Sequence, residues 1–285
     1  MTYSKAVALL SEAGIENAET DAAILFEHFA GIQRHTLPFR KNEEIESEEL
    51  TSALGRRLAR EPLQYILGEW EFCGLRFTLN SDCLCPRPDT ELIVELALKN
   101  LPPRAHFCDI GTGSGCIAIS LAKQIPNSKV YALDISEKAL EVAKENAINN
   151  DAEVAFIHDD ILSLNNKIET KFDIIVSNPP YVRELEKAEM RDNVLNWEPH
   201  NALFVSDSDP LIFYRNILEF AKTNLNQDGE IWFEINEYLG KEMTDLCKGY
   251  GFSDIEIFKD FRGKERALKT TRPQDYKTTS EGRSY

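Results

Sequence analysis

Between about residues 90 and 270, segments with the pattern of β-strands alternate with segments of helical periodicity. The expected strands are 106–110, 129–134, 154–158, 172–177, 230–235, 254–259 and 265–270. The expected helices are 115–124, 137–149, 211–225 and 237–249. Strands that alternate with helices at this spacing are joined by crossover connections, so the pattern predicts an α/β fold with a doubly wound, mostly parallel sheet.

The first 68 residues follow helical periodicity without intervening strands. Thr20 is the expected N-cap of one helix, which ends at Gly31. Ser47 is the expected cap of another helix, whose inward face carries leucines at helical spacing: Leu50, Leu54 and Leu58. These patterns predict a small N-terminal helical bundle.

The apolar period changes from 3.6 to 2 after Gly68. Apolar and polar residues alternate on both sides of Cys73-Gly74, which predicts a β-hairpin. Pro86 and Pro88 then keep the chain extended. We therefore expect four parts in chain order: a helical domain 1–68, a hairpin linker 69–88, an α/β domain 89–270 and a polar tail 271–285.

Composition excludes several classes of protein. The chain of 285 residues is 42% hydrophobic and 28% charged, which supplies a core and excludes a disordered chain. The apolar runs are too short to cross a bilayer and no apolar signal segment follows Met1, so we expect a cytoplasmic protein without a membrane segment. The formal net charge of −16 disfavours stable binding to nucleic acid. Six cysteines without a Cys-x-x-Cys pair predict reduced thiols and no metal site.

A glycine-rich turn follows the first strand of the alternating region. It reads Asp109-Ile110-Gly111-Thr112-Gly113-Ser114-Gly115. Glycines at such a turn let the backbone approach a ligand closely. Asp134 ends the next strand, 19 residues beyond Gly115, where a carboxylate can accept both hydroxyls of a ribose. The pattern predicts a site for an adenosine-containing ligand.

The ligand is expected to carry positive charge rather than a diphosphate. Cys116 occupies the position at which a dinucleotide fingerprint needs its third glycine, and no Gly-Lys-Ser/Thr follows for a phosphate loop. The Asp109 carboxylate would repel a diphosphate and attract an ammonium or sulfonium group. S-adenosylmethionine carries both cations and a ribose, so it is favoured over NAD as the cofactor.

The turn Asn178-Pro179-Pro180-Tyr181 follows an apolar strand, so it is expected at the same edge of the sheet as the glycine loop. Proline fixes φ and lacks an N–H, which makes this turn stiff and rich in hydrogen-bond acceptors. The side-chain oxygen of Asn178 and the carbonyl of Pro179 can together hold both hydrogens of one NH₂ group. Tyr181 offers a flat face to a planar substrate group.

Two converging acceptors suit an NH₂ group whose lone pair is delocalised. Such a nitrogen, in an amide or a nucleobase amine, is a poor nucleophile. Holding both hydrogens while positive charge grows on the nitrogen stabilises the transition state more than the ground state. Asn178 and Pro179 are therefore the predicted catalytic groups for methyl transfer to nitrogen.

Over about residues 1–270 the order of motifs resembles the release factor glutamine methyltransferases, the HemK/PrmC family. The segments that carry the resemblance are Gln64-Tyr65-Ile66-Leu67-Gly68, Phe72, Pro86-Arg87-Pro88-Asp89-Thr90-Glu91, residues 109–115, Asp134, Asn178-Pro179-Pro180-Tyr181, Glu198-Pro199 and Glu265-Arg266. The Pro-Arg-Pro-Asp-Thr-Glu segment is the most selective, because Asn-Pro-Pro-Tyr is shared with adenine and other amino-group methyltransferases.

The resemblance implies a class I S-adenosylmethionine-dependent methyltransferase with a Rossmann-like catalytic domain. Its implied substrate is the glutamine side-chain amide in the Gly-Gly-Gln loop of class I peptide release factors, on which the helical domain would dock. It implies that Asn178, Pro179, Pro180 and Tyr181 grip the glutamine, and we expect the protein to be a monomer. The cofactor-binding residues are expected to be Asp109, Gly111, Thr112, Gly113, Ser114, Gly115, Asp134, Asn178 and, beside the adenine, Asp160 and Ile161.

Two other functions stay open from the residues alone. A methyltransferase acting on an exocyclic amino group of a nucleic-acid base would use the same acceptor pair, although the acidic charge and the lack of a basic stripe stand against it. A non-enzymatic adenosine-binding regulator would explain Asp134 and the glycine loop but leave Asn-Pro-Pro-Tyr without a role.

Other conspicuous side chains receive structural interpretations. Arg87 and Glu91 are expected to tie the linker to the α/β domain. Glu234 is expected to make a structural hydrogen bond near the sheet edge. His158 and His200 are assigned no catalytic role.

Overall fold

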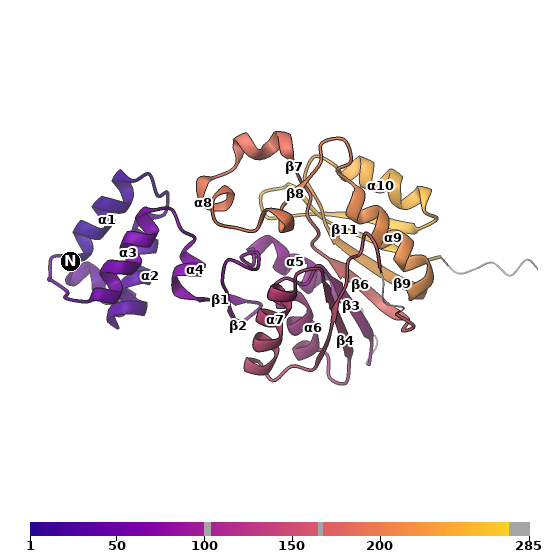
Figure 1. The fold of residues 1–285 in the computed structure, drawn as a ribbon, viewed down its shortest axis with the longest axis horizontal. Helices are drawn as coiled ribbons and strands as arrows, with labels where there is room; N and C mark the ends of the chain where they lie inside the picture. Colours follow the sequence, from indigo (N-terminus) through magenta and orange to yellow (C-terminus); the bar gives the residue numbers. More distant parts are fainter. Residues whose placement is uncertain (100–103, 165–167, 274–285) are drawn as a thin grey trace, which may run out of the picture.

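The computed structural model describes residues 1–99, 104–164 and 168–273. Within them lies a seven-stranded sheet of order β10-β11-β9-β6-β3-β4-β5 (Figure 1). Its strands are β3 (His106–Ile110), β4 (Lys129–Asp134), β5 (Val154–His158), β6 (Phe172–Ser177), β9 (Leu225–Glu234), β10 (Ser253–Lys259) and β11 (Glu265–Thr271). Neighbouring strands from β5 across to β9 are parallel, whereas β11 pairs antiparallel with β9 and β10. The predicted doubly wound, mostly parallel sheet is confirmed.

Helices cover both faces of this sheet. They are α5 (Pro88–Ala97), α6 (Cys116–Gln124), α7 (Glu137–Asn149), α9 (Ile212–Asn224) and α10 (Gly240–Gly249). Successive residues of a strand point to opposite faces, so Phe107 and Cys108 of β3 belong to different buried clusters. Helices α5, α6 and α7 contribute to the cluster of Phe107, and α9 and α10 to that of Cys108.

The strand order reverses beside β3. After β3 the chain runs outward through β4 and β5 and then returns to place β6 on the other side of β3. A crevice at the carboxyl ends of strands beside such a switch point is where ligands bind in doubly wound sheets. The glycine loop after β3, Asp134 at the end of β4 and Asn178 after β6 all lie at this edge.

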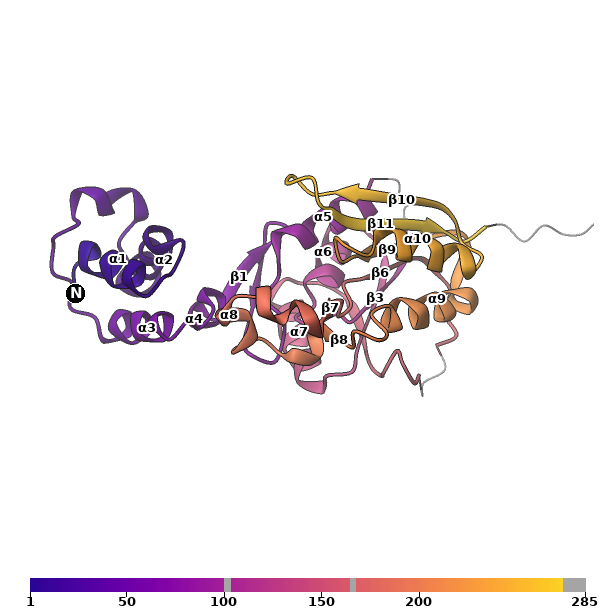
Figure 2. The same cartoon turned by 90° about the horizontal axis from the view of Figure 1, so that it is seen from above.

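The N-terminal helices surround a core of their own and stand beside the α/β part (Figures 1 and 2). They are α1 (Tyr3–Glu12), α2 (Ala18–Ala30), the 3₁₀ helix η1 (Arg34–Phe39), α3 (Glu48–Leu58) and α4 (Leu63–Leu67). Ser47 caps α3 as predicted, because its hydroxyl accepts the Leu50 N–H at 3.0 Å. The prediction that Thr20 caps α2 is wrong. The helix begins at Ala18 with Asn17 at the N-cap position, another residue type that favours this position, so Thr20 lies inside the first turn.

The linker begins with the predicted hairpin, β1 (Glu69–Phe72) and β2 (Leu75–Thr78). Cys73 and Gly74 form its turn with φ of 49° and 75°, the left-handed pair that a tight two-residue hairpin loop requires. Asn146 on α7 fixes β2 by accepting the Thr78 N–H at 2.6 Å and donating to the Thr78 carbonyl at 3.0 Å. The same Nδ2 donates to the Ser114 carbonyl at 2.9 Å. The hairpin is therefore bonded to both α7 and the glycine loop.

Further contacts hold the linker between the helical and α/β parts. The Tyr65 hydroxyl on α4 donates to the carbonyl of Cys83 at 2.7 Å. Arg87 Nη2 donates to Glu198 Oε1 at 2.6 Å, and Glu91 accepts a backbone N–H of the hairpin turn at 2.7 Å. These contacts confirm the structural interpretation of Arg87 and Glu91.

The segment between β6 and α9 has no counterpart among the elements expected from the sequence. It contains β7 (Val182–Arg183), the 3₁₀ helix η2 (Glu184–Glu189), α8 (Asp192–Leu195), the 3₁₀ helix η3 (His200–Ala202) and β8 (Phe204–Val205). It contacts the N-terminal helices through two ion pairs, Arg191–Glu16 at 2.6 Å and Arg60–Asp192 at 3.5 Å. Of the predicted polar tail, residues 274–285 lie outside the described residues.

Within the described part of the chain, no helix is both long and apolar enough to cross a bilayer. All six cysteines are free thiols. Among the same residues, no three His, Cys, Asp or Glu side chains are placed to hold one metal ion.

Candidate active site

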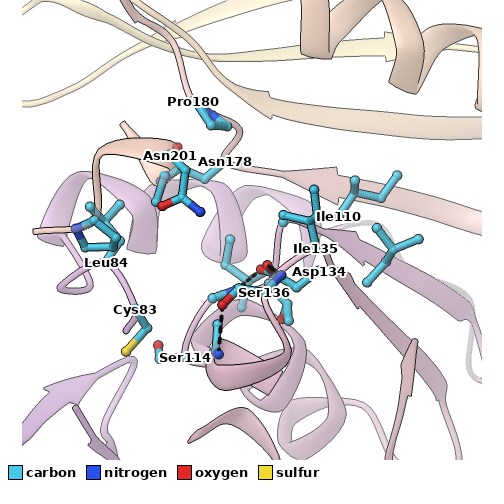
Figure 3. Close-up of a pocket in the computed structure, with 18 of the residues that line it drawn as sticks. Cys83, Leu84, Ile110, Ser114, Asp134, Ile135, Ser136, Asn178, Pro180 and Asn201 are labelled. Atoms are coloured by element: carbon cyan, nitrogen blue, oxygen red, sulfur yellow. Dashed lines mark hydrogen bonds between the residues drawn. The ribbon is translucent and has the colours of Figure 1, made fainter. Parts of the chain in front are cut away.

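A cavity of about 250 Å³ opens at the carboxyl ends of β3, β4 and β6. The loops after these strands line it, together with linker residues 82–87. Figure 3 shows Asn178 and Pro180 on one side of the cavity and Asp134 on the other. The fold thus brings the glycine loop, the acidic end of β4 and the Asn-Pro-Pro-Tyr turn to a single cavity.

Most of the predicted site residues lie in the cavity wall. Those present are Gly111, Thr112, Gly113, Ser114, Asp134, Asp160, Ile161, Asn178 and Pro180. Asp109, Gly115, Pro179 and Tyr181 lie behind or beside the wall. The contribution of residues 82–87 was not predicted, because Pro86 and Pro88 indicated only that the chain is extended there.

The glycine loop needs glycine for its backbone conformation. Gly111, Gly113 and Gly115 have φ of 77°, 55° and 81°, in the left-handed region that other residues rarely adopt. Gly115 is also closely packed, because an added Cβ would lie 2.9 Å from Ile119 Cδ1 and 3.1 Å from the Cβ of Ala143. At this last position both strain and packing exclude a side chain.

Gly115→Ala is therefore expected to lower the free energy of unfolding by about 1–3 kcal/mol, the usual range for a strained left-handed residue. Gly249→Ala is the matched control, because Gly249 is exposed at the end of α10 and an added Cβ meets nothing within 4 Å. The control should leave stability unchanged or raise it slightly. Urea unfolding of both variants measures the difference, and equal stabilities would contradict this account of the loop.

Asp134 is held by the backbone around it. Its Oδ2 accepts the Gly113 N–H at 2.8 Å and its Oδ1 accepts the Ser136 N–H at 2.9 Å. Burial raises the pKa of Asp134, while these backbone hydrogen bonds oppose the rise. Each carboxylate oxygen can accept a further hydrogen bond, so Asp134 keeps acceptor capacity for a ligand in the cavity.

Asp109 is fully buried behind the glycine loop rather than in the cavity wall. Its Oδ2 accepts the Thr112 hydroxyl at 2.6 Å and the Ala118 N–H at 3.2 Å. Its Oδ1 has no hydrogen-bond partner among the residues that the structure describes. Burial, partly offset by these hydrogen bonds, raises the pKa of Asp109 to about 7.

Asp160 and Ile161 follow β5 and border the cavity. The Asp160 carboxylate caps its own turn, since Oδ1 accepts the Leu162 N–H at 2.9 Å and Oδ2 accepts the Ser163 hydroxyl at 3.1 Å. Ile161 supplies apolar surface and packs against the core around Cys108.

The Asn-Pro-Pro-Tyr turn is anchored by hydrogen bonds on its inner side. Asn178 Nδ2 donates to the Thr90 hydroxyl oxygen at 3.2 Å. Glu234 accepts the Thr90 hydroxyl at 2.6 Å and the Tyr181 hydroxyl at 2.8 Å, which confirms the hydrogen-bonding role expected of this carboxylate. Burial raises the pKa of Glu234, while the two hydroxyl donors and the charge of Arg266 lower it. Tyr181 borders a second, smaller pocket that also includes Arg266.

The two histidines near the site contact backbone atoms. His158 Nε2 lies 2.9 Å from the Ile135 carbonyl, and His200 Nε2 lies 2.7 Å from the Leu195 carbonyl. Neither residue belongs to the cavity wall.

Comparison with known proteins decides the family. The family described as PrmC N-terminal domain matches residues 2–68, and the Methyltransferase small domain family matches residues 89–197. The release factor glutamine methyltransferase of Flavobacterium psychrophilum is 47% identical over 254 residues, which cover 86% of this chain and 89% of that protein. The chain belongs to the release factor glutamine methyltransferases.

This release factor glutamine methyltransferase is also 37% identical over 262 residues to its relative in Geobacter sulfurreducens, with 91% of each chain covered. A methyltransferase structure from Pyrococcus furiosus shares the fold, with a TM-score of 0.55 and 20% identity over 79% of this chain and 100% of that one. The resemblance predicted from the motifs is confirmed. The chain is accordingly an enzyme whose methyl donor is S-adenosylmethionine, and the non-enzymatic alternative falls away.

Proposed function

We propose that this enzyme transfers the methyl group of S-adenosylmethionine to the side-chain amide nitrogen of the glutamine in the Gly-Gly-Gln loop of class I peptide release factors. The observation that carries the proposal is the position of Asn178. Its Nδ2 is bonded to Thr90 on the inner side of the turn, and the residue borders the same cavity as the glycine loop and Asp134. An amide oxygen beside that cavity is an acceptor suited to the NH₂ group of a glutamine.

The residues around the cavity suit a cationic adenosine cofactor. Asp134 keeps acceptor capacity for a ribose, and the glycine loop allows close backbone approach. The unpaired Oδ1 of Asp109 and the unpaired hydroxyl oxygen of Ser114 are buried beside the loop without partners among the described residues. Asp160 and Ile161 are the proposed neighbours of the adenine. When bound, the cofactor supplies a methyl group that its sulfonium charge activates.

The protein's part in the chemistry is to hold the substrate amide. The side-chain oxygen of Asn178 and the carbonyl of Pro179 are the proposed acceptors for its two hydrogens. These hydrogens become more positive as the nitrogen attacks, so both contacts strengthen toward the transition state. Fixing the nitrogen also aligns it for in-line attack. Pro180 and Tyr181 are the other residues of this turn that are proposed to bind the substrate glutamine.

The division of the chain fits this proposal. Residues 1–68 are proposed as the domain that docks on the release factor, 69–88 as the linker and 89–270 as the catalytic domain. Support comes from a groove between the helical and α/β parts, whose lining includes three arginine–carboxylate ion pairs: Arg57–Asp21, Arg60–Asp192 and Arg191–Glu16. We further propose that the enzyme acts as a monomer in the cytoplasm, where release factors work.

A methylation assay tests the function directly. The purified enzyme, S-adenosylmethionine and a class I release factor are expected to yield one added methyl group on the loop glutamine, located by peptide mass spectrometry. A release factor with that glutamine replaced by alanine should remain unmethylated. Methyl groups found only on RNA or DNA would instead support transfer to a nucleobase amine, which the net charge of −16 disfavours.

Cofactor affinity is expected to rise with pH around neutrality. Asp109 has a pKa of about 7, so its carboxyl is mostly protonated at pH 6 and mostly ionised at pH 8. Only the ionised form attracts a cation, so the Kd for S-adenosylmethionine should fall about tenfold between these pH values. Calorimetry on the wild type and on Asp109→Asn measures this change. The variant should bind more weakly, with little pH dependence, and an unchanged tenfold response would assign the titration to another group.

A further inference from the structure

We propose that Thr90 and Glu234 are positioning residues that fix the orientation of the Asn178 side-chain amide, so that its oxygen and not its NH₂ group faces the substrate. The inference rests on the proposed function and adds to it two residues that lie outside the Asn-Pro-Pro-Tyr turn. Neither residue is proposed to touch the reacting atoms.

The three side chains form a continuous hydrogen-bonded chain from three separate segments. Glu234 ends β9, Thr90 lies in the first turn of α5 and Asn178 follows β6. Glu234 is 2% exposed and Thr90 is 3% exposed, so bulk water does not compete for their hydrogen bonds. The distances are 2.6 Å from Thr90 Oγ1 to Glu234 Oε2 and 3.2 Å from Asn178 Nδ2 to Thr90 Oγ1.

The direction of each hydrogen bond follows from the chemistry of the groups. In the structure the Thr90 hydroxyl donates its single proton to Glu234 Oε2. The Thr90 oxygen is then left as an acceptor, and the only donor on the Asn178 amide is its NH₂ group. The NH₂ group must therefore point to Thr90, and the oxygen must point the other way.

The orientation of the Asn178 amide determines whether this side chain can accept a hydrogen bond from the substrate amide. An asparagine amide has nearly the same shape in its two flipped orientations, so packing alone hardly distinguishes them. The wrong orientation would place one NH₂ group against the NH₂ group of the substrate glutamine, a contact between donors. The hydrogen-bonded chain from Glu234 through Thr90 disfavours that orientation.

Glu234 also holds the other end of the same turn. Its Oε1 accepts the Tyr181 hydroxyl at 2.8 Å, while its Oε2 serves Thr90. The two ends of the Asn-Pro-Pro-Tyr turn are thus tied to one buried carboxylate. Burial raises the pKa of this carboxylate, and the two hydroxyl donors together with the charge of Arg266 oppose that rise.

Thr90→Val tests the proposal, because valine keeps the shape of threonine and removes the hydroxyl. We expect kcat for release-factor methylation to fall about 10- to 100-fold, as for a misplaced reacting group. The Kd for S-adenosylmethionine, measured by calorimetry, should change less than about twofold. Thr90→Ser restores the hydroxyl and should recover most of the lost kcat.

Thr270→Val is the matched control. Thr270 is equally buried and its hydroxyl donates to the Ser253 carbonyl at 2.9 Å, in the antiparallel part of the sheet. This variant loses a buried hydroxyl hydrogen bond away from the cavity and should keep the wild-type kcat. A Thr90→Val enzyme with wild-type kcat, or with a loss that Thr90→Ser does not recover, would overturn the proposal.

Glu234→Gln provides a second test that keeps side-chain volume and does not depend on the folding of Thr90→Val. A glutamine can donate to Thr90, which frees the Thr90 proton to bond the Asn178 oxygen and so favours the wrong orientation. We expect kcat to fall by a similar factor with little change in the Kd of the cofactor. A wild-type kcat in this variant would contradict the role of Glu234.

The positioning role can be separated from the proposed function. Neutron diffraction of the wild-type enzyme locates the hydrogens of the Asn178 amide without any substrate. An NH₂ group directed at Thr90 supports the positioning, and an NH₂ group directed at the cavity overturns it. An enzyme with the expected amide orientation that fails to methylate release factors would refute the proposed function alone.

Discussion

Replacing Asn178 with alanine is expected to lower kcat by a factor of about 10²–10³ while the affinity for S-adenosylmethionine stays nearly unchanged. The variant loses the acceptor proposed for one amide hydrogen of the substrate. Because that hydrogen bond strengthens as the nitrogen becomes positive, its loss raises the transition state more than the bound ground state. Single-turnover methylation measures the rate of the chemical step, and calorimetry measures the affinity for S-adenosylmethionine.

Asn226→Ala is the control for this variant. Asn226 lies at the start of β9, at the opposite edge of the sheet from the cavity, where its Nδ2 donates to Asp173 Oδ1 at 2.8 Å. The same substitution there should leave kcat at the wild-type value. A normal rate in Asn178→Ala would remove Asn178 from the mechanism, and equal losses in both variants would point to general destabilisation.

Arg87→Ala is expected to lower the free energy of unfolding by about 3 kcal/mol, the lower end of the range for breaking a buried ion pair. Its partner Glu198 has a side chain that is fully buried, and the Arg87 guanidinium lies 2.6 Å from it. Without Arg87 the carboxylate keeps only the Cys85 N–H at 3.3 Å among the hydrogen bonds described for it. Urea unfolding with fluorescence detection measures the loss.

An exposed ion pair on the hairpin provides the control for the buried Arg87–Glu198 pair. Arg76 lies 3.2 Å from Glu69, with side chains 79% and 42% exposed. Exposed pairs contribute at most about 1 kcal/mol, so Arg76→Ala should unfold at nearly the wild-type urea concentration. If the two arginine variants lost the same stability, burial of Glu198 would not explain the effect.

The sheet could be predicted from the sequence because its central parallel strands are buried on both faces. Segments such as 129–134 and 172–177 therefore contain continuous apolar runs, at 130–133 and 174–176. The segment 182–210 could not be predicted in this way. Its strands β7 and β8 have two residues each and pair with one another across the intervening helices, so they leave no periodic pattern.

The site was predictable where its residues follow strand ends. The glycine loop, Asp134 and Asn178 each come directly after a strand or end one, which places them at one edge of the sheet. The link from Thr90 to Glu234 joins residues 144 positions apart, and no local pattern identifies such a partner. Asp109 belongs to the strand predicted at 106–110 and lies behind the glycine loop instead of in the cavity wall.

The hydrogen bond from the Tyr65 hydroxyl to the Cys83 carbonyl connects the N-terminal helices directly to the wall of the cavity. Tyr65 belongs to the last N-terminal helix, whereas Cys83 is part of the cavity wall. A protein that shifts α4 on docking would therefore shift the wall of the cavity proposed to hold the cofactor. Thermodynamic linkage then requires the release factor and the cofactor to alter each other's affinity by the same factor, whichever binds first.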